Sequence, residues 1–184
     1  MPQSISGEDF GVKDKVSYKN FIAKLDSRLK DYFELHSDYV HCKEGCSSCC
    51  EEGDYPISQP EAEYLMQGYI ALDNDTKIKV QNNIKLIKKG GACPFLLNNK
   101  CSVYPYRPII CRVHGLAYLC KEGTVKLPYC ANEGKNYSNV LNAGMVDIAP
   151  INENLDTKNL IAQYNSDAVY TIKNLIEWLS KEKA

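Results

Sequence analysis

The sequence predicts a mainly α-helical protein, a single domain over residues 1–184 with about four helices, irregular cysteine-rich loops and one or two small β-hairpins. Two observations predict this class. Four stretches carry apolar residues at three- and four-residue steps, the spacing of amphipathic helices. Two other stretches gather most of the nine cysteines among glycine, proline and asparagine, which favour turns. The length suits one domain with a core of its own.

The first expected helix covers roughly residues 14–37, where Phe21, Leu25 and Leu29 recur on one face and charged residues fill the other. It leads directly into the first cysteine cluster. We therefore expect this helix to build core and to hold that cluster in place.

A second helix is expected to begin after Ser58 and to run to about Ala71. Ser58 suits the N-cap position, and Glu61 three residues later completes the pattern of a capping box. A third helix begins at Asp73 or Asp75 and ends near a Lys-Lys-Gly-Gly sequence, because late positive charge and glycine close helices.

The remaining elements are shorter, apart from a C-terminal helix over residues 157–181. Alternating runs around the Asn-Asn-Lys sequence at 98–100 predict a small hairpin or knuckle. A short helix is expected at 109–113 after Pro108, and another hairpin at 119–127.

Four thiols fall within nine residues, Cys42 to Cys50, with the spacing C-x-x-x-C-x-x-C-C. A core does not need that density, since free cysteine packs singly as a small apolar residue. C-x-x-C spacing lets one turn present two thiolates to one metal ion. Cys49 and Cys50 leave the backbone in different directions, which suggests two neighbouring sites or a multinuclear cluster. A disulfide nest is the competing interpretation.

The candidate metal ligands are eight thiols in two expected metal-binding loops, residues 41–56 and 91–131. They are Cys42, Cys46, Cys49, Cys50, Cys93, Cys101, Cys111 and Cys130. Eight thiolates suit two zinc ions with four sulfurs each, and four of them could instead hold an iron–sulfur cluster. Cys120, within a predicted strand, is expected to be a spare thiol.

Arg107 and Arg112 flank Cys111, where a guanidinium would offset thiolate charge and donate N–H···S bonds. Either arginine could equally be an ordinary surface residue. His41 and His114 lie near cysteines and are possible ligands, although a lone histidine more often has another role.

The composition and charge of the chain limit the kinds of binding partner and the cellular location that we expect. The net charge of −1 gives no sign of nucleic-acid or anionic-membrane binding, and no apolar run approaches the length of a membrane span. The N-terminal sequence has no basic start and no apolar segment, so we expect a cytoplasmic protein whose thiols stay reduced. Common nucleotide-binding and hydrolase motifs are absent, which favours a protein that is not an enzyme.

The cysteine pattern continues with C-P-F-L from Cys93 and C-S-V-Y-x-x-R-P-x-x-C-R from Cys101 to Arg112. Together these motifs resemble the bacterial CxxCxxCC, or YkgJ-like, family, described as zinc- or iron-chelating. The continuation, His114-Gly115-Leu116 and then Leu127-Pro128-Tyr129-Cys130, resembles a subgroup with one further cysteine. The resemblance implies metal binding and no agreed reaction.

These observations favour a non-catalytic metal-binding protein that holds zinc, two ions by the cysteine count, or iron. It would store or deliver metal, or act as a metal-stabilised module for a protein partner. The alternative is an iron–sulfur redox or methyl-transfer accessory enzyme, because flagellin lysine N-methylases contain a related cysteine-rich region. A thiol–disulfide protein is a third hypothesis.

Overall fold

The computed structural model describes residues 12–51, 55–86, 91–119, 124–141 and 170–172. Three long helices dominate this part of the chain: α1 (Val12–Leu35), α3 (Gln59–Ala71) and α4 (Asn74–Leu86). The short helices are α2 (Ser48–Glu51), α5 (Ile109–Val113) and α6 (Ser138–Leu141), with 3-10 turns η1 (Tyr104–Tyr106) and η2 (Tyr129–Glu133). The mainly helical class is therefore confirmed. None of the described helices is both long and apolar enough to span a membrane.

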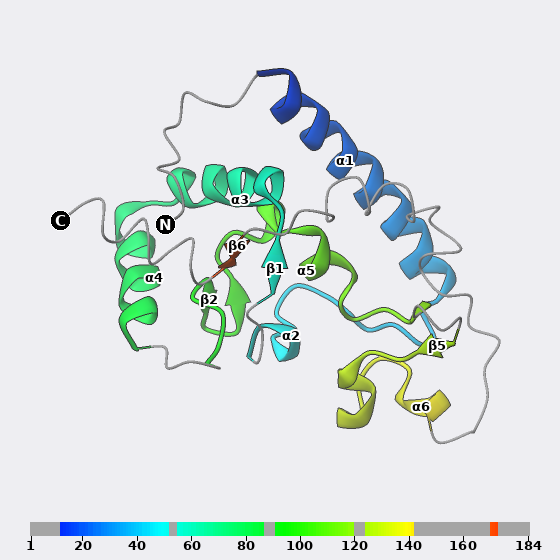
Figure 1. Cartoon of the computed structure of the whole chain (residues 1–184). Coiled ribbons are helices and arrows are strands. Elements are labelled where there is room, and N and C mark those ends of the chain that lie inside the picture. Colours follow the sequence, from blue (N-terminus) through cyan, green and yellow to red (C-terminus); the bar gives the residue numbers. More distant parts are fainter. Residues whose placement is uncertain (1–11, 52–54, 87–90, 120–123, 142–169, 173–184) are drawn as a thin grey trace.

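The helices pack into two groups. In Figure 1, α1 runs along one side of the molecule, α3 and α4 occupy the other, and α5 and α2 lie between them. The first apolar cluster, built mainly on α1, consists of Tyr18, Phe21, Ile22, Leu25, Leu29, Tyr32, Val40, Ile109, Leu116, Ala117, Ala131, Tyr137 and Val140. The second, built on α3 and α4, consists of Ile57, Ala62, Leu65, Tyr69, Val80, Phe95, Val103 and Ile172.

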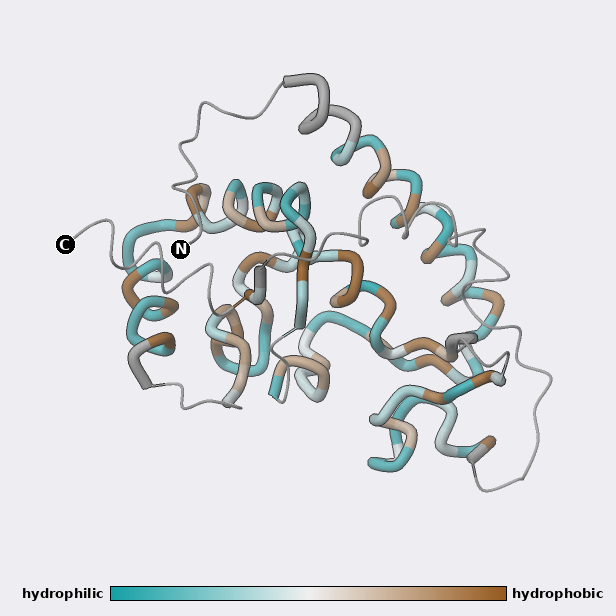
Figure 2. Tube along the Cα trace, viewed as in Figure 1, coloured by the Kyte–Doolittle hydropathy of each residue, from teal (hydrophilic) through white to brown (hydrophobic). Residues whose placement is uncertain are grey.

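The apolar stripe predicted for the first helix is confirmed. Phe21, Leu25 and Leu29 of α1 are all buried, together with the adjacent Ile22, while residues 23–24 and 26–28 are exposed. Apolar and polar positions alternate around α1 in Figure 2, as a helix with one buried face requires. The second and third helices also lie within a few residues of their predicted ranges.

Three two-stranded antiparallel ladders complete the fold. β2 (Leu96–Leu97) and β3 (Lys100–Cys101) form the predicted knuckle, and both turn residues, Asn98 and Asn99, have positive φ. Asparagine tolerates this left-handed conformation better than most residues. β4 (Tyr118–Leu119) pairs with β5 (Val125–Lys126), which confirms the second hairpin.

The third ladder corrects one prediction. β1 (Pro56–Ile57) pairs with β6 (Tyr170–Thr171), so these two residues form a strand where the sequence predicted the C-terminal helix 157–181. Ile172, which follows, is buried in the second apolar cluster. Long-range pairing with β1 therefore overrides the local helical pattern at this point. Residues 157–169 and 173–181 lie outside the described part of the chain.

Glu61 joins two helices through one buried carboxylate. Its Oε2 accepts hydrogen bonds from the backbone N–H and the hydroxyl of Ser58, at 2.7 and 2.6 Å, which forms the predicted capping box of α3. Its Oε1 accepts a further bond of 2.9 Å from the backbone N–H of Ile109, at the start of α5. Burial raises the pKa of this fully buried carboxyl, and the three hydrogen bonds oppose that rise.

We expect Glu61→Gln to destabilise the fold by about 2–3 kcal/mol. An amide cannot accept all three hydrogen bonds, and it would set an N–H against a backbone or hydroxyl donor in a buried site. Urea unfolding followed by circular dichroism measures the change. Glu34→Gln, at an exposed position of α1, is the matched control and should leave the unfolding midpoint almost unchanged. Equal midpoints for the two variants would contradict the role given to Glu61.

Candidate metal centre

The first cysteine segment forms a tight loop followed by helix α2. Gly45 takes a φ of +95°, and the backbone N–H of Cys46 donates to the Lys43 carbonyl at 3.0 Å. Only glycine adopts such a φ at little cost, so Gly45 allows the loop to turn. Cys42 and Cys46 are exposed on this loop, whereas Cys49 and Cys50 on α2 are half-buried.

The adjacent thiols of α2 lie closer together than the sequence suggested. The sulfurs of Cys49 and Cys50 are 3.9 Å apart, because consecutive side chains on a helix diverge by about 100° and not by the half-turn of a strand. Two thiolates on one tetrahedral zinc, with zinc–sulfur bonds of about 2.3 Å, lie about 3.8 Å apart. The pair therefore has the spacing of two ligands of a single ion or cluster.

The second cysteine segment is tied to the first by the backbone. The N–H of Cys93 donates to the carbonyl of Cys50 at 2.6 Å. Cys93, Cys101 on β3 and Cys111 on α5 all pack against the second apolar cluster. We call these three the inner thiols.

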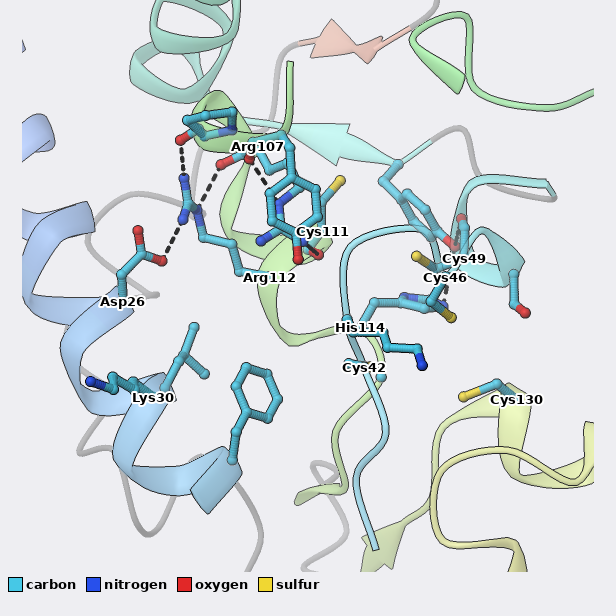
Figure 3. A pocket seen from close by; sticks show the side chains of 18 of the residues that line it. Asp26, Lys30, Cys42, Cys46, Cys49, Arg107, Cys111, Arg112, His114 and Cys130 are labelled. Atoms are coloured by element: carbon cyan, nitrogen blue, oxygen red, sulfur yellow. Dashed lines mark hydrogen bonds and ion pairs between the residues drawn. The ribbon is translucent and has the colours of Figure 1, made fainter. Parts of the chain in front are cut away.

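The outer thiols are Cys42, Cys46 and Cys130, which face a pocket of about 470 Å³ between α1 and the cysteine loops. Figure 3 shows Cys42, Cys46 and Cys130 on one side of this pocket and Lys30 of α1 on the other. Cys130 is carried by η2. Cys49 and Cys111 also line the pocket, so it borders both groups of thiols.

Cys42 is held by a buried asparagine that the sequence did not reveal. Asn136 is only 3% exposed, and its side chain donates to the Cys42 sulfur at 2.9 Å and to the Gly115 carbonyl at 2.7 Å. Its Oδ1 accepts a bond of 2.8 Å from the backbone N–H of His41. A Cβ on Gly115 would lie 2.4 Å from the Cys42 sulfur, so Gly115 leaves the space that Cys42 occupies.

The thiols raise one another's pKa values. Burial and then neighbouring thiols, with an opposing hydrogen bond from Asn136, raise the pKa of Cys42 to about 11. The hydrogen bond with Cys50 and burial raise the pKa of Cys49, and burial raises those of Cys101, Cys111 and Cys130. Thiolates crowded in this way need a compensating cation.

The electrostatic interactions between thiols divide them into the same two groups, the inner and the outer thiols. Cys46 and Cys130 act on Cys42, while Cys93 and Cys101 act on Cys111. Cys49 acts on members of both sets. The Cys49–Cys50 pair thus stands between the outer and the inner thiols.

The two candidate arginines have different surroundings. Arg107 donates hydrogen bonds to the carbonyls of Tyr104 and Cys111, and its guanidinium stacks on the Tyr104 ring at 3.4 Å from the ring centroid. Its positive charge lowers the pKa values of Cys49, Cys101 and Cys111 and so opposes the effect of burial. Arg112 instead forms an ion pair with Asp26 of α1 and donates to the carbonyls of Pro105 and Arg107. In Figure 3 its side chain extends toward Asp26 and away from Cys46 and Cys130. Both arginines line the pocket, and the outer-shell role predicted for them stays a prediction.

The two candidate histidines also differ. His41 is exposed. His114 lines the pocket, and its Nε2 lies 3.2 Å from the Tyr55 hydroxyl. Burial lowers its pKa, which keeps the imidazole neutral at pH 7. Cys120 lies outside the described residues.

The donor set fits zinc or iron, although its members have not converged. None of the eight described cysteines forms a disulfide, and soft sulfur ligands select these metals. Within the described residues, no three Cys, His, Asp or Glu side chains lie close enough together to hold one ion. Ion binding therefore requires side-chain rotation or a shift of the loops to bring a third and a fourth ligand to the same point.

The comparison with known families agrees with this donor set. Residues 41–134, more than half of the chain, match the model of the CxxCxxCC family, described as "Putative zinc- or iron-chelating domain". The chain belongs to this family, and the matched range contains all eight candidate ligands. Metal binding is therefore the function that family membership indicates. No curated protein and no solved structure matches the chain.

We expect Asn136→Ala to lower the free energy of unfolding by about 2–4 kcal/mol. The substitution leaves the His41 N–H and the Gly115 carbonyl without their partner in a buried site, at roughly 1–3 kcal/mol for each group. Asn139→Ala is the control, because Asn139 is exposed and makes only a long 3.4 Å bond to the Asp38 carbonyl. Chemical denaturation of both variants provides the comparison. A loss no larger than that of the control would show that Asn136 does not organise the loop.

Proposed function

We propose that the protein binds zinc or iron through thiolates from both cysteine segments, in two neighbouring sites that meet at the Cys49–Cys50 pair. The observation that carries this proposal is the hydrogen bond between Cys93 and Cys50, together with the two mutually interacting sets of thiols on either side of it. Eight thiols are enough for two ions, since a closed structural zinc site uses four ligands.

The binding is non-catalytic in this proposal. The inner thiols are half-buried against the second apolar cluster, which supports a closed structural site. Arg107 offsets part of the thiolate charge from beside Cys111, which supports a role as an outer-shell partner. Free thiols require a reducing compartment, and we place the protein in the cytoplasm. Storage, delivery or stabilisation of a protein-binding module are the tasks that such a site can serve.

Metal analysis of anaerobically purified protein tests the proposal directly. Zinc–thiolate protein is colourless, whereas an iron–sulfur cluster gives a brown protein with visible absorption. The number of thiols that react with an alkylating reagent should be higher after chelation removes the metal, and the increase should equal the number of cysteine ligands. Protein that takes up neither metal under reducing conditions would contradict the proposal.

Cys49→Ser and Cys111→Ser should each lower metal content and stability together. Ligands that converge only in the native state make the free energy of metal binding part of the free energy of folding. The apparent binding free energy of a structural zinc ion is about 10–16 kcal/mol. We expect each variant to lower the free energy of unfolding of the metal-bound protein by about 3 kcal/mol or more. Atomic absorption and thermal unfolding, measured on one preparation, provide both numbers. Full metal loading with unchanged melting would mean that the two segments do not share the metal.

Cys130→Ala should lose part of the bound metal, whereas Cys120→Ala should keep it. Cys130 faces the pocket with Cys42 and Cys46, and Cys120 is the thiol that the sequence analysis leaves spare. The two variants remove the same group from the same part of the chain, so each serves as the other's control. Metal-to-protein ratios decide between them. Equal losses would show that Cys120 is also a ligand.

A further inference from the structure

We propose that His114 is a nitrogen ligand of the outer site, and that Tyr55 and the Cys49 carbonyl set its tautomer for that role. This inference rests on the proposed function, because it assigns a fourth ligand to the outer thiols. It concerns a residue that the cysteine pattern does not include.

The tautomer follows from counting protons. The Tyr55 hydroxyl has one proton, and it donates that proton to the Cys49 carbonyl oxygen at 3.0 Å, since a carbonyl can only accept. The same hydroxyl lies 3.2 Å from His114 Nε2. With its proton already donated, the hydroxyl oxygen accepts there, so Nε2 carries the hydrogen. The lone pair of the neutral ring is therefore on Nδ1.

This arrangement has the features of a metal-binding histidine. A ligating imidazole usually donates its second ring N–H to a fixed acceptor, which holds the ring and exposes the other nitrogen. Here the acceptor is Tyr55, anchored in turn to the backbone of Cys49, a proposed ligand. The Tyr55 and His114 rings also pack with centroids 4.8 Å apart at an interplanar angle of 52°, which further restrains the imidazole. Among the described residues, no hydrogen bond engages Nδ1.

The position of His114 relates it to the outer thiols. It follows α5 and directly precedes Gly115, the residue whose backbone abuts the Cys42 sulfur. It lines the pocket together with Cys42, Cys46 and Cys130, and Figure 3 shows it beside Cys42 and Cys46. The outer site therefore consists of three thiols and one imidazole, a ligand set that structural zinc sites use.

The assignment of His114 also bears on which site Cys49 and Cys50 of α2 serve. The carbonyl of Cys50 accepts a hydrogen bond from Cys93, and Cys49 acts electrostatically on Cys101 and Cys111 as well as on Cys42 and Cys130. With His114 in the outer site, both α2 thiols are available to the inner thiols. The inner thiols then need only one sulfur of this pair to reach four ligands, and no outer position is left short of a ligand.

Cadmium NMR of the cadmium-loaded full-length protein tests the inference, because the cadmium shift separates four-sulfur sites from sites with three sulfurs and one nitrogen. The wild-type protein should give one resonance of each kind. His114→Gln should remove the mixed resonance, and His114→Cys should restore the ion while moving its resonance into the four-sulfur range. His41→Gln, at the exposed histidine beside Cys42, is the matched control and should change neither signal.

Tyr55→Phe provides a second variant that keeps every ligand. It should weaken outer-site affinity about 10- to 100-fold in a chelator competition, the usual effect of removing an outer-shell partner, and should weaken the inner site less, because there it removes only the hydrogen bond to the Cys49 carbonyl. Two wild-type resonances in the four-sulfur range, both unchanged by His114→Gln, would overturn the inference while leaving the proposed function intact. A wild-type protein that binds no metal would overturn the proposed function itself.

Discussion

The buried carboxylate of Glu61 is the contact on which the arrangement of the cysteine loops depends. It closes the first turn of α3 through Ser58 and holds the first turn of α5 through Ile109. α5 carries Cys111 and leads into His114 and Gly115, so ligands of both proposed sites take their positions from this one helix. A carboxylate that accepts three hydrogen bonds in a buried site fixes direction as well as distance, because each donor must point at an oxygen lone pair.

The two apolar clusters explain why α5 needs such a contact. Ile109 belongs to the first cluster, while Cys111, two residues later, packs against the second. A helix of five residues buries too little surface to hold itself between two cores, and short helices are marginal without tertiary contacts. The ion pair of Arg112 with Asp26 ties the same helix to α1. α5 is thus fastened to α3 by Glu61 and to α1 by Arg112, with the thiol of Cys111 between these attachments.

The sequence predicted those parts of the protein that depend on local patterns. The stripe on α1, the capping box at Ser58 and the Asn98–Asn99 turn are encoded within a few residues, and the structure confirms each. The strand at Tyr170–Thr171 was missed because its partner lies more than a hundred residues earlier.

The candidate site shows the same division between local and long-range information. The spacing of the cysteines identified them as candidate metal ligands. Nothing in a single sequence distinguishes Asn136, whose side chain donates hydrogen bonds to Cys42 and Gly115, from the exposed Asn139. The sequence raised His114 as a possible ligand without deciding the question. Its contact with Tyr55, 59 residues away in the chain, appears only in the folded protein.

The apolar clusters and the cysteine loops are held together by different interactions. The buried members of both apolar clusters are apolar side chains, and Cys93, Cys101 and Cys111 pack only against the edge of the second cluster. The loop around Cys42 to Cys46 is largely exposed, and polar contacts with Asn136 are what hold it. Thiols with raised pKa values also stay protonated unless a cation stabilises their thiolates. In the proposed sites, an ion would therefore add stability at the junction between the clusters, and it would act on the segments that carry the proposed ligands.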